Sequence, residues 1–295
     1  MDLVVISGKG GTGKTTMASA FSELAKKPVR VDCDVDAPNL HMFYEGQDIY
    51  RKDFFGGKKA VINYDKCIKC GICEKICKFN AIKNIKIDDL ICEGCGACVI
   101  TCPSQAITLF DEKTADIFIK EVRNGILSRS QMEVGSDGSG KLVTSLRKEA
   151  KAFQNKDTIT IIDASPGIGC SVIASITDAK NAIIIPEPTK SGLSDLKRIL
   201  ELCEHFELYV MVCINKYDIN EEMTLEIENF VKSKSINIVG KVPFDDIVMK
   251  SVNELKPITE YKDSNACQAI ENMWYNIEKN ITIQEEKYGR RTKIL

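Results

Sequence analysis

Short apolar runs alternate with longer segments of helical periodicity through most of the chain. The apolar runs have the length of buried strands, and they cover residues 3–7, 29–33, 158–163, 181–186, 208–214 and 236–242. Between them, residues 14–26, 191–206 and 221–234 have the spacing of amphipathic helices. This alternation is typical of a doubly wound α/β fold. We therefore expect a mostly parallel sheet with helices on both faces.

The alternation breaks between residues 34 and 157, where a block of cysteines lies. We predict that a small domain at 60–110 interrupts the larger fold, which would consist of residues 1–59 and 111–295. After this domain, residues 114–134 have the pattern of a hairpin that turns at Arg123-Asn124-Gly125. A helix is expected near 141–153.

Composition excludes several classes of partner. The 295 residues contain 40 basic and 42 acidic side chains, with 44% hydrophobic residues. This balance gives no electrostatic basis for binding nucleic acid or for stable membrane association. No run approaches the roughly 18 apolar residues of a membrane span. The strand-like run Leu3-Val4-Val5-Ile6 begins too early to follow a signal peptide, so we expect a cytoplasmic protein.

Eight of the thirteen cysteines form a tandem repeat between Cys67 and Cys102, with an offset of 25 residues. Each half has the spacing C-x-x-C-x-x-C-x-x-x-C, which is that of bacterial-type ferredoxins. The insert is therefore interpreted as a small α+β ferredoxin domain that holds two [4Fe-4S] clusters. In this motif the fourth cysteine of each run binds the other cluster. The expected ligands are Cys67, Cys70, Cys73 and Cys102 for cluster one, and Cys92, Cys95, Cys98 and Cys77 for cluster two.

Zinc is the competing metal, because C-x-x-C pairs also suit tetrahedral zinc; two complete four-cysteine runs favour clusters. The first run ends in Cys77-Lys78 where the motif has proline, which leaves the ligands intact. Cysteines outside the repeat are expected to be small buried residues, namely Cys33, Cys203, Cys213 and Cys267. Cys170 follows a predicted switch segment, and a redox or cluster-transfer role stays open for it.

A phosphate-binding loop follows the first strand. The segment Gly8-Lys9-Gly10-Gly11-Thr12-Gly13-Lys14-Thr15 fits the P-loop pattern and opens a helix. Its glycines allow backbone N–H groups to approach phosphate oxygens at the positive end of the helix dipole. Lys14 is expected to reach the β and γ phosphates, and the Thr15 hydroxyl to bind Mg²⁺. Thr16 completes the predicted loop.

The run from Lys9 to Thr16 resembles the deviant Walker A motif of the MinD and nitrogenase iron-protein class. In that class two subunits enclose two nucleotides, and the extra lysine reaches the phosphates of the opposite subunit. The resemblance implies that Lys9 acts in trans within a homodimer, or within a hetero-dimer with a related chain. A solvated lysine without function is the alternative.

Two further segments resemble the switches of the same class. In Val31–Leu40 the resemblance implies that Asp34 positions the attacking water and that Asp32 belongs to the magnesium shell; Asp36 has no clean counterpart. Ile161–Gly167 resembles Walker B and the second switch. There Asp163 would bind Mg²⁺ through water, and the Gly167 N–H would contact the γ-phosphate. Three carboxylates close together at a strand end favour a bound cation.

Base recognition has two interpretations. Asn215-Lys216-Tyr217-Asp218 matches the N-K-x-D motif that binds guanine in small GTPases. The resembled family instead uses Asn at this strand end for adenine, and Val242-Pro243-Phe244-Asp245 resembles its adenine-contacting loop. We favour ATP, with Asn215 and Pro243 near the base.

The leading functional hypothesis is an ATPase that couples nucleotide binding and hydrolysis to electron transfer through two clusters, with an unidentified redox or iron-sulfur partner. In this hypothesis, residues 41–59 and 111–157 are linkers that change the orientation of the inserted domain. Two alternatives are an ATP-dependent cluster assembly or carrier protein, and a MinD-like positioning ATPase with structural clusters. The tail at 285–293 lacks the apolar face that membrane targeting by the latter would use.

Overall fold

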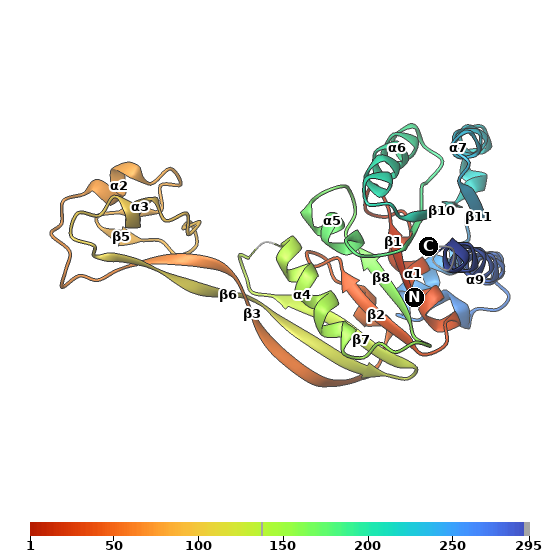
Figure 1. Ribbon diagram of the computed structural model, residues 1–295, viewed down its shortest axis with the longest axis horizontal. Helices are drawn as coiled ribbons and strands as arrows, with labels where there is room; N and C mark the ends of the chain where they lie inside the picture. The colour runs from red at the N-terminus through yellow and green to blue at the C-terminus, as the bar shows by residue number, and fades with distance from the viewer. Residues whose placement is uncertain (137, 292–295) are drawn as a thin grey trace. The chain divides into compact units, whose positions relative to one another are not determined.

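The computed structural model describes residues 1–136 and 138–291, so the end of the tail lies outside the described residues. A nine-stranded sheet forms the framework (Figure 1). Its strands are β1 (Asp2–Ile6), β2 (Pro28–Cys33), β3 (Gly46–Ile62), β6 (Ile107–Val122), β7 (Gly125–Met132), β8 (Ile159–Ala164), β9 (Asn181–Ile184), β10 (Tyr209–Asn215) and β11 (Asn237–Val242). A separate pair consists of β4 (Ile82–Lys83) and β5 (Lys86–Ile87).

The strand order is β11-β10-β9-β1-β8-β2-β7-β6-β3. Pairing is parallel from β11 through to β7. This confirms the mostly parallel sheet expected from the sequence. The predicted hairpin is also present as β6 and β7, which are neighbours joined through residues 123 and 124. In the register of β2 and β8, Asp32 lies directly opposite Asp163, so two of the predicted acids share one edge of the sheet.

Helices lie between the strands and after the last of them. They are α1 (Lys14–Leu24), α2 (Ile72–Ile76), α3 (Ala97–Ile100), α4 (Gly140–Lys151), α5 (Cys170–Ile176), α6 (Lys190–His205), α7 (Glu221–Ser233), α8 (Asp246–Asn253) and α9 (Asn265–Arg291). Three short 3-10 turns are η1 (Leu40–Phe43), η2 (Tyr217–Ile219) and η3 (Ile258–Glu260). Side-chain oxygens of Ser139, Thr189 and Asn220 cap α4, α6 and α7.

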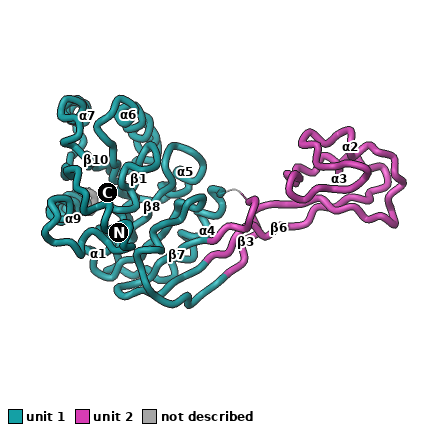
Figure 2. The backbone as a smooth tube through the Cα atoms, turned by 180° about the vertical axis from the view of Figure 1, so that it is seen from behind, with its two compact units in different colours: residues 1–51, 118–130, 138–295 teal, residues 52–117, 131–137 magenta. Residues whose placement is uncertain are grey.

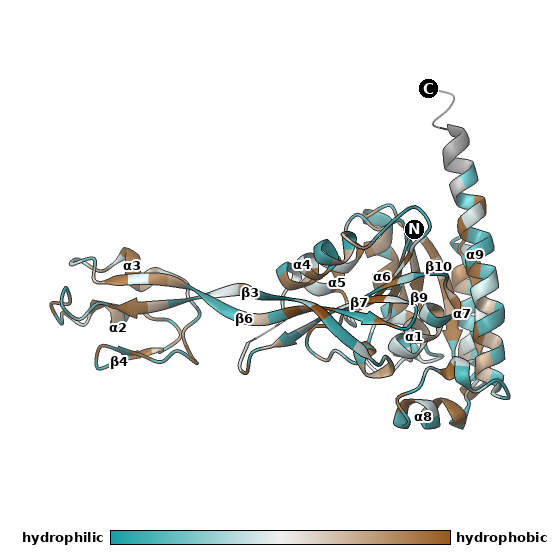
Figure 3. Cartoon of the chain, turned by 90° about the horizontal axis from the view of Figure 1, so that it is seen from below, coloured by the Kyte–Doolittle hydropathy of each residue, from teal (hydrophilic) through white to brown (hydrophobic). Residues whose placement is uncertain are grey.

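The sheet is covered on both faces, because the consecutive residues Leu3 to Ile6 of β1 are all fully buried. One face packs against α1 and α9, whose apolar residues recur every three or four positions. Figure 3 shows hydrophobic and hydrophilic residues side by side along α9. Phe21 of α1 stacks on Trp274 of α9, with ring centroids 5.5 Å apart, and this contact joins α9 to the helix that follows the phosphate loop.

The chain divides into two compact units (Figure 2). Unit 1 contains residues 1–51, 118–130 and 138–295, and unit 2 contains 52–117 and 131–137. The predicted domain boundaries at 59/60 and 110/111 fall inside β3 and β6, which both run through the unit boundary. Residues 46–59 and 111–122 are therefore strands, and the prediction of linkers there was wrong. The two segments neighbour each other in the sheet, which satisfies backbone groups that a linker would leave to water.

Unit 2 has a small apolar core. Its buried hydrophobic residues are Ala60, Ile62, Cys73, Ile82, Cys98 and Ile107, and the other cysteines that pack against them are Cys67, Cys77, Cys92 and Cys102. Cysteine side chains thus supply a large share of the interior. Domains this small usually need a metal or disulfides in addition to their apolar contacts, and none of the thirteen cysteines, all of them among the described residues, forms a disulfide.

Among the described residues, no helix has the length and hydrophobicity needed to cross a bilayer.

Removing the Phe21 ring should destabilise unit 1 strongly. We expect Phe21→Ala to lower the free energy of unfolding by roughly 3–5 kcal/mol, because a buried aromatic is replaced by a cavity. Chemical denaturation of purified protein measures this. Tyr275→Ala is the matched control, since Tyr275 directly follows Trp274 in α9 and is 67% exposed. A similar loss for both variants would contradict the proposed role of the Phe21–Trp274 contact.

Candidate nucleotide site and cysteine cavities

The loop from Gly8 to Gly13 depends on glycine at specific positions. Gly13 has φ +87°, and a Cβ there would lie 2.5 Å from Nδ2 of Asn215. At Gly8 a Cβ would lie 2.1 Å from Cβ of Asp195. Gly11 also has positive φ, at +81°. Gly13 starts α1 without a side-chain cap, so the first N–H groups of this helix stay available for an anion.

Lys14 is a buried cation held by carboxylates. Its Nζ lies 2.5 Å from Oδ1 of Asp163 and 3.8 Å from Oδ2 of Asp34. Burial alone would lower the pKa of Lys14, but the charge and hydrogen bond of Asp163, followed by the charges of Asp34 and Asp32, more than offset it and raise the pKa. Lys14 therefore stays charged at every physiological pH.

Asp32 is fully buried between two strand ends. Its carboxylate accepts hydrogen bonds from the N–H groups of Leu40 (3.0 Å) and Asp34 (3.2 Å). Burial, and then the charge of Asp163, raise the pKa of Asp32 well above its usual value. A carboxyl whose folded-state pKa is raised stabilises the fold below its unfolded pKa, and this contribution is lost as pH rises through the folded pKa. At neutral pH the ligand-free pocket thus carries an electrostatic penalty that a divalent cation would relieve.

Buried polar atoms at the same place lack partners within the described residues. They are Oδ2 of Asp163 and Oγ1 of Thr12. Burial also raises the pKa of Asp34, with Lys14 opposing the shift. Across the described chain, no three His, Cys, Asp or Glu side chains converge on a single-ion position. Lys14 instead pairs with the carboxylate predicted to bind Mg²⁺, since a buried carboxylate needs a cation.

An open pocket with an empty volume of about 1520 Å³ extends from the loop. Its polar side includes Lys9, Lys14, Thr15, Thr16, Asp34 and Ser165. Its apolar wall consists of Val242, Val248, Met249, Val252 and Ile270. Val242 belongs to the loop expected near adenine, whereas the other four residues were not predicted. The apolar spacing within α8 is the sequence signal that could have found this wall. One polar and one apolar side suit a molecule with phosphates at one end and a planar base at the other.

The N-K-x-D segment is occupied by internal contacts. Oδ1 of Asp218 accepts the N–H of Phe244 at 2.7 Å, and Nζ of Lys216 donates to Glu187 Oε1 at 2.6 Å. Asn215 does line the pocket, while its Nδ2 donates to the carbonyl of Thr12 at 2.8 Å. Pro243 is not among the lining residues. The carboxylate that would read guanine is therefore already engaged.

Three other predicted residues lie at the rim of the site. Lys9 is 39% exposed, and its Nζ donates to Ser191 Oγ at 3.2 Å and lies 3.8 Å from Glu187 Oε2. The N–H of Gly167 donates to the Ser7 carbonyl at 2.9 Å, so a contact with phosphate would have to replace this bond. Asp36 lines the pocket and accepts the N–H of Gly138 at 2.9 Å, which gives it a structural partner that the sequence did not reveal.

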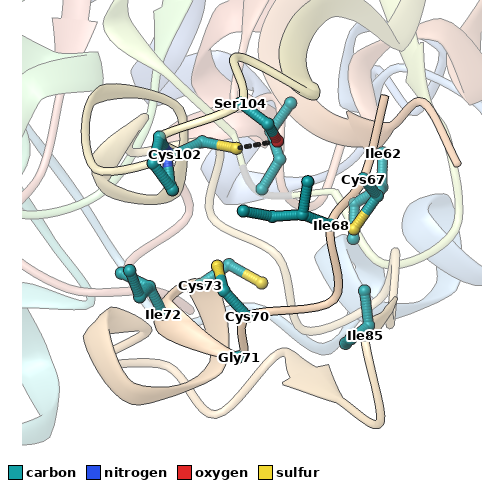
Figure 4. Close-up of a pocket in the computed structure, with 12 residues that line it drawn as sticks. Ile62, Cys67, Ile68, Cys70, Gly71, Ile72, Cys73, Ile85, Cys102 and Ser104 are labelled. Atoms are coloured by element: carbon teal, nitrogen blue, oxygen red, sulfur yellow. Dashed lines mark hydrogen bonds between the residues drawn. The ribbon is translucent and has the colours of Figure 1, made fainter. Parts of the chain in front are cut away.

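The eight cysteines of the repeat surround two separate cavities in unit 2, each with an empty volume of about 330 Å³. The first is lined by Cys67, Cys70, Cys73 and Cys102 (Figure 4). The second is lined by Cys77, Cys92, Cys95 and Cys98. The structure thus groups the cysteines as the crossed ligand sets of the repeat require, with the last cysteine of each run at the other run's cavity.

Equivalent positions of the repeat make equivalent contacts. The N–H of Ala81 donates to Sγ of Cys77, and the N–H of Ala106 to Sγ of Cys102, both at 3.3 Å. The Ala106 bond is the main reason that the pKa of the Cys102 thiol is lowered. Gly71 and Gly96 both have positive φ, at +72° and +79°, at the start of α2 and α3. Backbone N–H groups directed at sulfur are the arrangement that stabilises a thiolate.

The cysteines outside the repeat divide as expected. Cys33, Cys203, Cys213 and Cys267 are buried. Burial raises the pKa of Cys33, Cys203 and Cys213 to about 12, so these thiols are unreactive. Cys170 is exposed at the start of α5.

Comparison with known proteins identifies the nucleotide-binding fold. Residues 3–258 match the family described as the CobQ/CobB/MinD/ParA nucleotide binding domain. The chain belongs to this family. Similar proteins include an uncharacterized protein of Methanocaldococcus jannaschii, 36% identical over 75% of this chain and 79% of that protein. The septum site-determining protein MinD of Bacillus subtilis is 26% identical over 99% of this chain and 96% of its own.

Solved structures of the family share the fold. MinD of Pyrococcus horikoshii in complex with Mg-ADP superposes with a TM-score of 0.61 at 17% identity, covering 96% of this chain and 97% of that one. As a MinD/ParA-type protein, the chain is a P-loop ATPase. The names of these relatives support the ATPase part of the sequence prediction and say nothing of iron-sulfur clusters.

The close approach of Asn215 makes Gly13 the most sensitive loop position of this MinD/ParA-type ATPase. Gly13→Ala should weaken ATP binding at least about tenfold and lower the melting temperature, because the new Cβ is strained at φ +87° and displaces Asn215. Calorimetric titration and thermal denaturation measure the two effects. In Gly10→Ala the new Cβ meets nothing within 4 Å, so its melting temperature should be unchanged. Equal melting temperatures for both variants would refute this explanation.

Proposed function

We propose that this ATPase holds two [4Fe-4S] clusters in unit 2 and couples ATP binding and hydrolysis to electron transfer through them. The observation that carries the proposal is the arrangement of eight cysteines around two equal cavities in the crossed pattern of a duplicated ferredoxin motif. Unit 2 would then be a bacterial-type ferredoxin domain inserted in the family's fold.

The cavities fit clusters better than single metal ions. A tetrahedral zinc ion needs four sulfurs about 2.3 Å from one point, whereas no group of three or more such ligands converges in the described residues. A cubane cluster instead separates its four ligands across a cage. The N–H bonds to Sγ of Cys77 and Cys102 would offset negative charge on the cluster sulfurs. When bound, the clusters would supply one-electron redox chemistry.

For the nucleotide we propose ATP with Mg²⁺. Asp218 would have to release the Phe244 N–H to read guanine, and the apolar wall suits an adenine ring. Lys14 would leave Asp163 for the phosphates, and Asp163 would turn to Mg²⁺ together with Asp32 and the Thr15 hydroxyl. Asp34 would hold the attacking water as general base. Lys14 thus exchanges one anionic partner for another, so its charge stays paired throughout.

Hydrolysis is proposed to require two chains. Lys9 extends from the loop with its ammonium group near the surface, and its present partners Ser191 and Glu187 are weakly held contacts of an exposed side chain. A second copy, or a related chain, would bring its nucleotide within reach of Lys9.

A positioning role like that of the septum site-determining relatives is the second candidate. It is favoured by the similarity to MinD over nearly the whole chain. In that case the clusters would only hold unit 2 together, and their redox state would not respond to nucleotide. A cluster-carrier role would instead need a labile cluster, which four cysteine ligands per cavity do not favour.

Removal of one predicted cluster ligand tests the proposal. In protein purified without oxygen, Cys73→Ala should lose about half of the iron and sulfide, because Cys73 lines one cavity only. Iron and sulfide analysis measures the loss. Cys203→Ala is the control, since Cys203 is a buried cysteine of unit 1. Equal iron contents in both variants, or wild-type protein that folds without iron, would exclude the clusters.

Lys9→Ala should retain ATP binding and lose ATP turnover by at least about 100-fold, because a transition-state charge contact supplied by a second chain would be missing. Steady-state phosphate release and calorimetric ATP binding measure the two effects. Lys190→Ala, an exposed lysine at the start of α6, is the control. Full activity of Lys9→Ala would refute a role in trans.

A further inference from the structure

The two halves of the cysteine repeat carry opposite charge. Residues 64–86 contain two acids and six lysines, namely Lys66, Lys69, Lys75, Lys78, Lys83 and Lys86. Residues 87–110 contain no lysine or arginine and three acids, Asp88, Asp89 and Glu93. None of the six lysines has a lysine at the position 25 residues later. Since both halves keep the same cysteine spacing, the spacing does not require this difference in charge.

We refer to Lys66, Lys69, Lys83 and Lys86 as the lysine rim, because each flanks a segment that lines the cavity of Cys67, Cys70, Cys73 and Cys102. Lys66 and Lys69 flank Cys67 and Ile68, which line the cavity. Lys83 and Lys86 flank the β4–β5 turn, whose Ile85 lines this cavity, while the two lysines themselves line a neighbouring hollow together with Asp88. The second cavity is instead lined by Glu93.

The lysine rim is exposed to solvent. All four side chains are exposed, and none forms an ion pair within the described residues. Lys83 and Lys86 lie directly opposite each other across the β4–β5 pair. Like charges in this position destabilise a strand pair, and an acidic partner would remove that repulsion.

Apolar side chains lie among these charges. Ile68 is 64% exposed and Tyr64 is 60% exposed, and Ile68 is drawn at the cavity in Figure 4. The Tyr64 hydroxyl donates to the Ile85 carbonyl at 3.2 Å, which links it to the β4–β5 turn. An apolar centre with a charged border is the composition of a transient protein interface.

We propose that the lysine rim, with Ile68 and Tyr64, docks an acidic protein that accepts single electrons from this chain. The inference rests on the proposed function, because the electron would come from the cluster in the adjoining cavity. In the transfer, the reduced cluster loses one electron and the acceptor's redox centre gains it, with no proton or bond change. The lysines would also stabilise the more negative, reduced form of that cluster. The electron would then reside preferentially on the cluster beside the docking surface.

A protein fits this surface better than an anionic membrane or a nucleic acid does. Both of those are extended polyanions, and the acidic half of the same small unit would repel them. Ile68, which is exposed and lines the first cavity, instead provides a compact apolar contact beside the proposed cluster.

The test uses the full chain purified without oxygen, with iron and sulfide counted first. Flavodoxin serves as the acidic one-electron probe and cytochrome c as the basic one. Binding is measured by calorimetry, and electron transfer by stopped-flow absorbance, at low and high ionic strength. The rim variant carries Lys66→Gln, Lys69→Gln, Lys83→Gln and Lys86→Gln. The control variant carries Lys26→Gln, Lys148→Gln, Lys151→Gln and Lys156→Gln, which are exposed lysines of unit 1.

We expect flavodoxin to bind wild type and control alike, to bind the rim variant at least about tenfold more weakly, and to lose affinity in high salt. Equal affinity for rim and control variants, tighter binding of cytochrome c, or rim-dependent binding to phosphatidylglycerol vesicles would overturn the docking proposal. Iron-free protein that still binds flavodoxin through the rim would refute the clusters and leave the surface standing. Iron-loaded protein whose flavodoxin binding does not depend on the lysine rim would refute the docking surface and leave the clusters standing.

Discussion

The nucleotide half of the molecule depends on one electrostatic constraint. The parallel pairing of β2 and β8 places Asp32 directly opposite Asp163, and both are fully buried. Two buried carboxylates at one sheet edge need a cation. Lys14 supplies it in this structure, through Asp163 and Asp34. The same constraint makes the pocket sensitive to nucleotide. If Lys14 moved to the phosphates of a bound nucleotide, Asp32 and Asp163 would need a metal ion as their cation.

Unit 2 is subject to a comparable constraint. Its apolar core is small, and cysteine side chains form much of it. Free thiols facing two cavities give such a core little stability by themselves. Metal clusters in those cavities would cross-link both halves of the repeat, because each cavity takes one cysteine from the opposite run. Folding of the unit and its redox chemistry would then depend on the same eight side chains.

Much of this could be predicted from the sequence, for identifiable reasons. Strands such as β1 and β8 are continuous apolar runs, and Gly8–Thr15 has a fixed spacing set by phosphate geometry. The cysteine grouping followed from the repeat alone. Residues 41–59 were misjudged as a linker because β3 is largely exposed and lacks an apolar run. The apolar wall from α8 and α9 was missed because it assembles from segments far apart in the chain, and Asp36 because its partner Gly138 is 102 residues away.

The two halves are joined in the chain where nucleotide-dependent changes would arise, because the segment after Asp34 leads through η1 into β3, and β3 enters unit 2. Only a difference in contacts between nucleotide states can drive coupling. The most direct test is the midpoint potential of the clusters, measured by redox titration without nucleotide, with MgADP and with a non-hydrolysable MgATP analogue. Coupling predicts a shift of at least about 60 mV between states, a tenfold change in the electron-transfer equilibrium. Identical potentials in all three states would contradict it.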